Sequence, residues 1–167
     1  MYAEGERFDA DVLFMNHRCI ALGWPLIGDL TQLPTTREAF KHRLSDLYKP
    51  FGNLTDDRIR SGSGALYKFL VEIEVGDVVV YRSTYDEQLF IGEVTGEYEF
   101  DVEEQPAYPD ARHRRGVSWY QPRGYFSDSA QKAASVRQSL RQITDKATVQ
   151  EFLKALKNAK AEQAAGS

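Results

Sequence analysis

Cysteine is almost absent from this chain of 167 residues, which contains Cys19 alone. A single cysteine excludes an internal disulfide framework and any zinc cluster built from cysteines, and it suits a reducing, cytoplasmic setting. The three histidines, His17, His42 and His113, lack the spacing of metal ligands. We therefore expect neither a metal nor a cofactor.

Long apolar runs are missing as well. No run approaches the roughly 18 residues that span a membrane, and the first six residues lack the basic region and apolar stretch of a secretory signal. We expect no contact with a membrane.

Motifs for catalysis are also missing. The sequence has no glycine-rich phosphate loop ending in Lys-Ser or Lys-Thr. The strands expected at 77–82 and 88–94 lack the lysine that a metal-dependent nuclease carries in its Glu-x-Lys motif. Cys19 lies in an apolar segment, which favours a buried structural thiol over a nucleophile. The sequence therefore predicts a protein that is not an enzyme.

Basic residues are not in excess, because the formal net charge is −4. This balance does not suit a protein that wraps or packages nucleic acid. One local basic run exists at residues 112–115, which read Arg-His-Arg-Arg before an expected strand. A solvated loop is the ordinary interpretation of such a run, but its size also suits a module that holds a few phosphates.

Apolar residues at helical spacing predict helices in the first half and in the tail of the chain. The expected helices are 8–16 with Phe8, Val12 and Met15 facing inward, one capped by Thr35 and ended before Pro50, one from Ser63 to Gly76, and 146–159 capped by Asp145. Residues 51–63, which include Arg58 and Arg60, are expected to form a loop. Residues 161–167 are expected to fray.

Between residues 76 and 122 the pattern changes to that of strands. The expected strands are 18–22, 77–81, 88–94, 97–100 and 116–121, with a hairpin turn at 83–87. The order of helices and strands predicts an α+β fold with an antiparallel sheet, which the later strands could close into a small barrel.

Four stretches of sequence occur in an order that matches a known family. The stretches are residues 19–24 with 28–30, residues 69–80, residues 90–98 and residues 113–119. Together they resemble the EVE/YTH-type domains of the PUA-like superfamily, which are found in McrB-like and Mrr-like modification-dependent restriction systems. The resemblance implies a small antiparallel β-barrel flanked by helices. It divides the chain into a base-reader domain at 1–143 and a C-terminal helix with a frayed tail or linker at 144–167.

The resemblance also implies a function and its residues. Such domains take a base out of its stack and hold it in an aromatic pocket, here expected around Trp24. The expected base-binding residues are Trp24, Asp29, Tyr81, Ser83, Trp119 and Tyr98. The expected phosphate-binding residues are Arg112, His113, Arg114, Arg115, Arg123, Arg58 and Arg60. The partner would be DNA with a methylated cytosine or adenine, and a separate nuclease or AAA+ motor would act on it.

Each of these assignments has a structural alternative. Trp24, Trp119 and Tyr98 are also suited to a core, and Asp29 is a residue type that often caps a turn. The function has alternatives too. The chain could read modified RNA instead of DNA, or the same scaffold could bind a protein or a small ligand.

Overall fold

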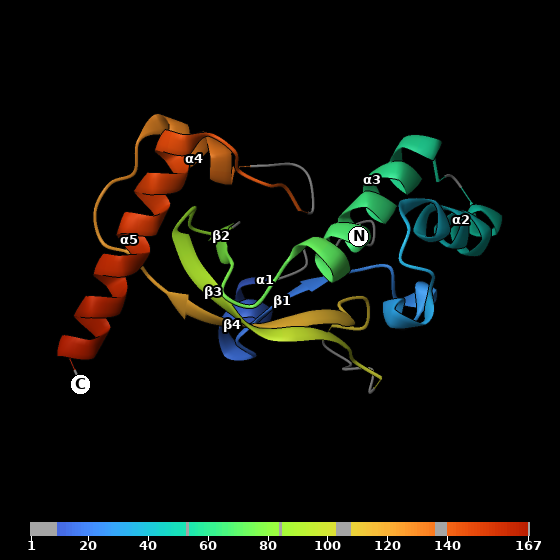
Figure 1. Ribbon diagram of the computed structural model, residues 1–167, viewed down its shortest axis with the longest axis horizontal. Coiled ribbons are helices and arrows are strands. Elements are labelled where there is room, and N and C mark those ends of the chain that lie inside the picture. The colour runs from blue at the N-terminus through green and yellow to red at the C-terminus, as the bar shows by residue number, and fades with distance from the viewer. Residues whose placement is uncertain (1–9, 53, 84, 103–107, 136–139, 167) are drawn as a thin grey trace.

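The computed structural model describes residues 10–52, 54–83, 85–102, 108–135 and 140–166. Four strands form one sheet in the order β1-β4-β3-β2, and all neighbours are antiparallel. The strands are β1 (Cys19–Leu22), β2 (Val78–Arg82), β3 (Leu89–Phe100) and β4 (His113–Tyr120). The sheet is curled like half a barrel (Figure 1). The predicted α+β class with an antiparallel sheet is confirmed, and within the described residues β1 and β2 are the edges of an open sheet.

Helices pack on both sides of this sheet. They are α1 (Ala10–Asn16), α2 (Arg37–Tyr48), α3 (Asp56–Tyr67) continued by the π-helical turn η4 (Lys68–Glu72), α4 (Asp128–Ala134) and α5 (Lys146–Ala165). Short 3₁₀ turns add η1 (Pro25–Ile27), η2 (Leu30–Gln32) and η3 (Lys49–Phe51). Figure 1 shows α2 with α3 as one helical lobe and α4 with α5 as another, on opposite sides of β2.

The prediction of a loop at 51–63 is wrong, because α3 begins within these residues. Thr55 caps this helix by accepting a hydrogen bond from the Arg58 amide at 3.3 Å, and two aspartates follow in the first turn. Ser63 is buried in the middle of the helix instead of capping it. The cap of α2 is also one residue later than expected, because Thr36 and not Thr35 accepts from the Ala39 amide.

The two strands expected at 88–94 and 97–100 are one continuous strand, β3. Its pairing with β4 shifts register between Val94 and Tyr98, which is a β-bulge. Gly96 lies against Gly116 at this point, and a Cβ on Gly96 would come within 2.9 Å of the Gly116 nitrogen. Two glycines on facing strands therefore let the bulge form without ending the strand.

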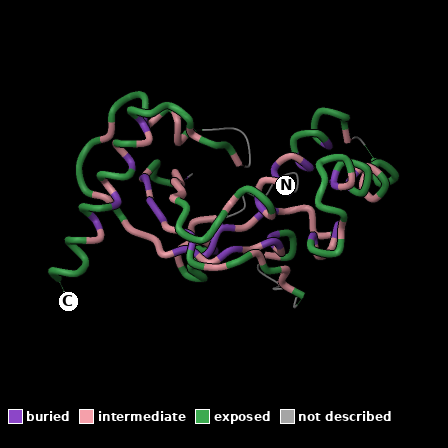
Figure 2. The backbone as a smooth tube through the Cα atoms, viewed as in Figure 1, coloured by how far each residue is buried: buried purple, intermediate pink, exposed green. Residues whose placement is uncertain are grey.

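Three clusters of buried side chains hold the elements together (Figure 2). The largest joins α2, α3 and one face of the sheet. A second joins α4 and α5 to the opposite face through Leu89 and Ile91. The third holds α1 through Leu13, which is completely buried, while Val12 is 41% exposed. The inward face expected for this helix was therefore wrong, and Phe8 lies outside the described residues.

The last helix is longer and better packed than expected. Asp145 caps it as predicted, accepting from the Thr148 amide at 2.9 Å. The helix continues to Ala165, so the frayed tail expected from 161 is wrong up to that residue. Phe152 and Leu156 are buried against the sheet, and Lys160 forms an ion pair with Glu93 of β3. Helix α5 is thus packed onto the sheet.

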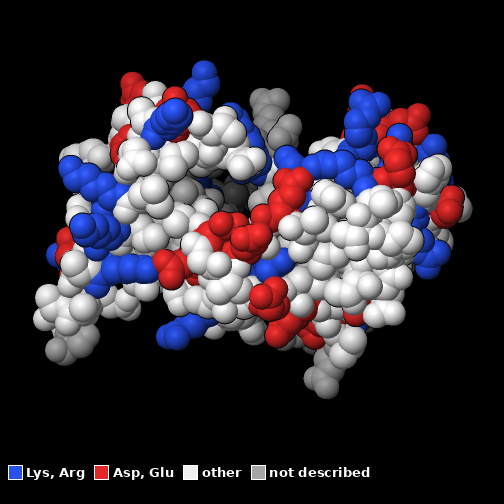
Figure 3. Space-filling view, viewed as in Figure 1, with Lys and Arg blue, Asp and Glu red and all other residues white. Residues whose placement is uncertain are grey.

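A cleft of about 520 Å³ lies beside the edge strand β2, where the two helical lobes face each other. Val78 and Val80 line its floor, with Ile73 and Phe152 on its walls. The space-filling view shows a hollow in this face, bordered by both basic and acidic side chains (Figure 3). None of the described helices has the length and hydropathy needed to cross a membrane.

Candidate functional site

The predicted base-binding residues fall into two groups at opposite ends of β4. Tyr81 and Ser83 lie beside Trp119, near the end of the strand. Tyr98 and the carbonyl of Trp24 meet at His113, where the strand begins. Six residues of an extended strand separate His113 from Trp119, which is about 20 Å. The structure does not bring Trp24 together with Tyr81 and Trp119.

Three rings from three different elements meet in the first group, and we name Phe14, Tyr81 and Trp119 the aromatic cluster. Phe14 of α1 contacts Tyr81 edge-on with centroids 4.9 Å apart, and it stacks on Trp119 at 6.1 Å. Tyr81 and Trp119 are 6.3 Å apart. All three residues are partly exposed, and Phe14 and Trp119 also pack against the main hydrophobic core.

The Trp119 ring has a fixed position. It lies over Gly92 on the neighbouring strand, where a Cβ would come within 2.8 Å of the ring. The indole Nε1 donates a hydrogen bond to the Cys19 carbonyl at 3.3 Å. The absence of a side chain at Gly92 and this hydrogen bond together fix the position of the ring.

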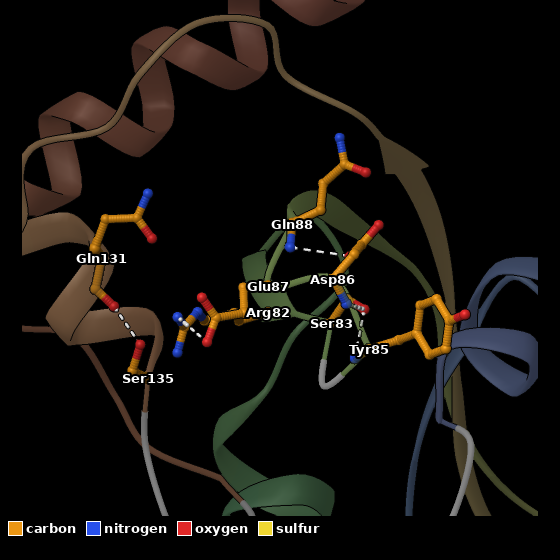
Figure 4. A network of polar contacts seen from close by, with 8 residues as sticks. All are labelled: Arg82, Ser83, Tyr85, Asp86, Glu87, Gln88, Gln131 and Ser135. Carbon is orange, nitrogen blue, oxygen red and sulfur yellow. Dashed lines mark hydrogen bonds and ion pairs between the residues drawn. The ribbon is translucent and has the colours of Figure 1, made fainter.

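A carboxylate lies directly beside the aromatic cluster. The Tyr81 hydroxyl donates to Asp11 Oδ1 and the Ser83 hydroxyl donates to Asp11 Oδ2, both at 2.5 Å. Ser83 is 2% exposed and also accepts from the amides of Tyr85 and Asp86 (Figure 4). A carboxylate oxygen has capacity for more than one hydrogen bond. Asp11 therefore offers an oriented acceptor at the hydroxyl of Tyr81, one of the three rings of the aromatic cluster.

Trp24 is packed between α2 and α3. Its ring lies so close to Gly62 that a Cβ there would be 2.6 Å from Cζ2, and it meets Tyr48 edge-on at 5.0 Å. Its backbone has a left-handed conformation with φ of 70°, which turns the chain into η1. These contacts are those of a core residue, which is the structural alternative for Trp24. We therefore do not include Trp24 in the candidate site.

Asp29 and Tyr98 organise the loop that follows Trp24. The Asp29 carboxylate accepts from the Thr31 amide at 2.9 Å and from its hydroxyl at 2.8 Å, so it caps η2. The Tyr98 hydroxyl accepts from the Leu30 amide at 3.1 Å and lies 2.8 Å from His113 Nδ1. Burial raises the pKa of Tyr98 to about 12. Both residues therefore have structural partners.

His113 connects this loop to the sheet. Its Nε2 faces the Trp24 carbonyl at 3.2 Å, and because a carbonyl can only accept, Nε2 carries the proton and Nδ1 accepts from Tyr98. The ring is completely buried, and this burial lowers the pKa of His113 to about 4. The expected phosphate contact is out of its reach in this structure.

The depressed pKa of His113 predicts a pH-dependent stability. The unfolded chain protonates this residue near pH 6.5, whereas the folded protein keeps it neutral down to about pH 4. Its contribution is therefore complete above pH 6.5 and is lost as the pH falls towards 4. Between pH 7 and 5 the free energy of unfolding should fall by about 2 kcal/mol through this group.

Urea unfolding at pH 7 and pH 5 tests this expectation. His113→Gln should lose much less stability between the two pH values than the wild type does. His42→Gln is the control, because His42 is exposed on α2 and its replacement should keep the wild-type dependence. An unchanged pH dependence in His113→Gln would contradict the assignment.

The basic run Arg112 to Arg115 is not the loop that the sequence predicts, because three of its four residues belong to β4. Arg115 is 2% exposed and donates to the carbonyls of Phe69, Leu70 and Gly96. Arg114 pairs with Asp101 at 3.2 Å and donates to Ala111.

Arg112 is engaged in a similar way. Its side chain donates to the carbonyls of Asp101 and Val102 and stacks over Phe100 at 4.6 Å. These guanidinium groups donate hydrogen bonds to backbone carbonyls of the protein itself. We therefore do not assign phosphate contacts to Arg112, Arg114 or Arg115.

The remaining predicted phosphate ligands lie on the surface, Arg58 and Arg60 on α3 and Arg123 beside α5. Arg123 is 85% exposed and lies 3.5 Å from Glu162 of α5. Arg58 and Arg60 lie on α3 and not in a loop, and Arg60 pairs with Asp57 at 3.2 Å. The structure does not gather these three residues into one basic patch.

Sequence reasoning missed two residues of the site, Asp11 and Phe14. They are three residues apart on α1, so they project from the same side of the helix. The signal was present as a carboxylate and an aromatic at that spacing in a short helix. The apolar pattern of Phe8, Val12 and Met15 concealed it.

Comparison with known proteins gives a family without a described activity. The family described as a domain of unknown function, DUF8426, matches residues 5–145. The match ends at Asp145, the N-cap of α5. No curated protein and no solved structure matches the chain. Among the described residues, no group of three or more His, Cys, Asp or Glu is placed to hold a metal ion. Because the match covers well over half of its length, the chain belongs to the DUF8426 family.

Proposed function

We propose that this protein is a PUA-like domain of the EVE/YTH type that binds a single nucleic-acid base, methylated cytosine or adenine, at the aromatic cluster. One observation carries the proposal. Rings from α1, β2 and β4 contact one another, and the hydroxyl of one of them, Tyr81, donates to the Asp11 carboxylate, which Ser83 also holds through a second hydrogen bond. Rings provide stacking surfaces, and the carboxylate provides an acceptor for the edge of a base.

The binding free energy of such a site comes from a few contributions of about 1–3 kcal/mol or less. Stacking on an aromatic side chain contributes about 1–3 kcal/mol per base. An exocyclic amino group, which both adenine and cytosine carry, can donate to Asp11. A methyl group buried against the rings adds about 0.8 kcal/mol, which alone gives only a few-fold preference. A stronger preference for the methylated base requires a polar contact or a steric rejection.

The proposed domain recognises and does not cut. A nuclease or an AAA+ motor on another chain would act where this domain binds, as in modification-dependent restriction systems. DNA is the proposed ligand, and modified RNA is the alternative that uses the same rings and the same carboxylate.

Trp119→Leu should weaken binding about tenfold, because it removes one stacking surface. The measurement is fluorescence anisotropy with short DNA and RNA oligonucleotides, with and without a methylated cytosine or adenine, at one fixed low salt concentration. Trp24→Phe is the matched control, and it should leave the affinity within about twofold because Trp24 lies at the other end of the sheet.

The same panel can refute the proposal. Binding to no oligonucleotide would refute base binding altogether. Equal affinity for methylated and unmethylated oligonucleotides would refute the preference for a modified base. Circular dichroism of Trp119→Leu establishes that it is folded, and Phe14→Leu provides a second variant in the same cluster.

A second candidate function rests on the cleft beside β2. Its volume of about 520 Å³ is typical of small-ligand sites, and its floor is apolar. A small-ligand or peptide-binding module would use this cleft and leave the aromatic cluster unused. Val80→Trp would fill the cleft, so it should abolish ligand or peptide binding there and leave oligonucleotide binding unchanged.

A further inference from the structure

The basic run that the sequence offers for phosphate contacts, Arg112 to Arg115, is engaged within the protein, and the formal net charge is −4. Protein–duplex affinity comes largely from neutralised phosphates. Extruding a base from a duplex also costs free energy, because pairing and stacking are lost. A single strand does not carry this cost, so it suits a site that depends on stacking.

A further aromatic residue, Tyr85, is connected to the proposed site through its backbone amide and is largely exposed. Tyr85 lies in the turn between β2 and β3, and it is 93% exposed. Its amide donates to Ser83 Oγ at 3.1 Å, and Ser83 in turn donates to Asp11. Tyr85 is therefore attached through two hydrogen bonds to the carboxylate of the proposed site.

The turn that carries Tyr85 is held by polar contacts on both sides. Arg82 pairs with Glu87 at 3.0 Å, and the Gln88 amide donates to Asp86 Oδ1 at 3.1 Å. Figure 4 shows the Tyr85 ring directed away from the Arg82–Glu87 pair. An exposed ring on a braced turn is a ready stacking surface for a planar ligand.

We infer that the ligand of this domain is a single strand, bound through two consecutive bases. One base enters the aromatic cluster beside Asp11, and the neighbouring base stacks on Tyr85. This inference rests on the proposed function, because it names the form of nucleic acid that the same site accepts. Recognition through stacking also means a weak salt dependence, since few phosphates are neutralised.

Anisotropy titrations with one sequence in two forms test the inference. A labelled eight-nucleotide single strand should bind at least tenfold more tightly than a blunt duplex that contains it. Tyr85→Ala should weaken binding to the single strand about fivefold or more, and Tyr85→Phe should retain it. Tyr125→Ala is the control, because Tyr125 is also fully exposed but lies next to α4 and α5.

The possible results distinguish the single-strand inference, the role of Tyr85 and the proposed function from one another. Duplex binding as tight as single-strand binding would overturn the single-strand inference. A Tyr85→Ala variant with wild-type affinity, alongside a weakened Trp119→Leu, would overturn the role of Tyr85 and leave base binding intact. Failure of the wild type to bind either form would overturn the proposed function itself.

Discussion

Replacing Arg115 with methionine should lower the free energy of unfolding by about 3 kcal/mol or more. The guanidinium donates to three backbone carbonyls, of Phe69, Leu70 and Gly96, and it is almost completely buried. Methionine fills similar space but donates nothing, and each buried acceptor left without a partner costs about 1–3 kcal/mol. Because two of these carbonyls belong to η4, the variant should also loosen the end of α3.

Urea denaturation of Arg115→Met beside Arg58→Met measures this effect. Arg58 is exposed on α3, so its replacement should change the free energy of unfolding by less than about 0.5 kcal/mol. An equal and small effect in both variants would show that the carbonyls of η4 find other partners, which would contradict a structural role for Arg115.

Phe152→Ala should destabilise the whole domain by about 3–5 kcal/mol, the usual cost of removing a buried phenylalanine. Phe152 is 3% exposed and packs with Leu89 and Ile91 of β3, although α5 lies beyond the residues that the family match covers. If α5 is part of the domain, unfolding of the variant should remain a single cooperative transition at lower denaturant.

The neighbouring residue supplies the control for this experiment. Leu153 is on the same helix and 40% exposed, so Leu153→Ala should cost less than about 1 kcal/mol. A second, separate transition in Phe152→Ala, with the sheet unchanged, would mean that residues 146–165 fold as an independent appendage.

Local pattern was sufficient to predict most of the elements. Two runs rich in apolar residues predicted β2 and the first part of β3, and helical spacing with a capping aspartate predicted α5. In α5 the buried Phe152 and Leu156 lie on one face, so helical spacing survives in the fold, whereas the valines of β2 pack on both faces of the sheet. The bulge in β3 was not predictable in the same way, because it depends on Gly116 of a strand distant in sequence.

The basic run was misread because charge alone does not show where a side chain points. In β4 every second residue faces inward, which places His113 and Arg115 in the interior and Arg114 on the other face. Their partners are backbone carbonyls of distant segments, and no spacing in the sequence reveals such partners. Buried cations of this kind are rare, so the loop expectation was the ordinary one.

The candidate site was predicted in part. Tyr81 of β2 and Trp119 of β4 do lie close together, on either side of β3, and Ser83 follows directly after β2 and shares Asp11 with Tyr81. The resemblance predicts a pocket around Trp24, but Gly62 of α3 leaves room for the Trp24 ring to pack inward. That contact joins residues 38 positions apart in sequence, and only the fold brings them together.

The most direct test of base binding at the aromatic cluster uses the two tryptophans of the chain. Their indole N–H groups give two resolved signals in an ¹⁵N-correlated NMR spectrum, and Trp24→Phe assigns them. Titration with a single-stranded oligonucleotide carrying a methylated base should shift the Trp119 signal and leave the Trp24 signal in place. A shift confined to Trp24, or none in either signal at saturating oligonucleotide, would contradict a base site at Phe14, Tyr81 and Trp119.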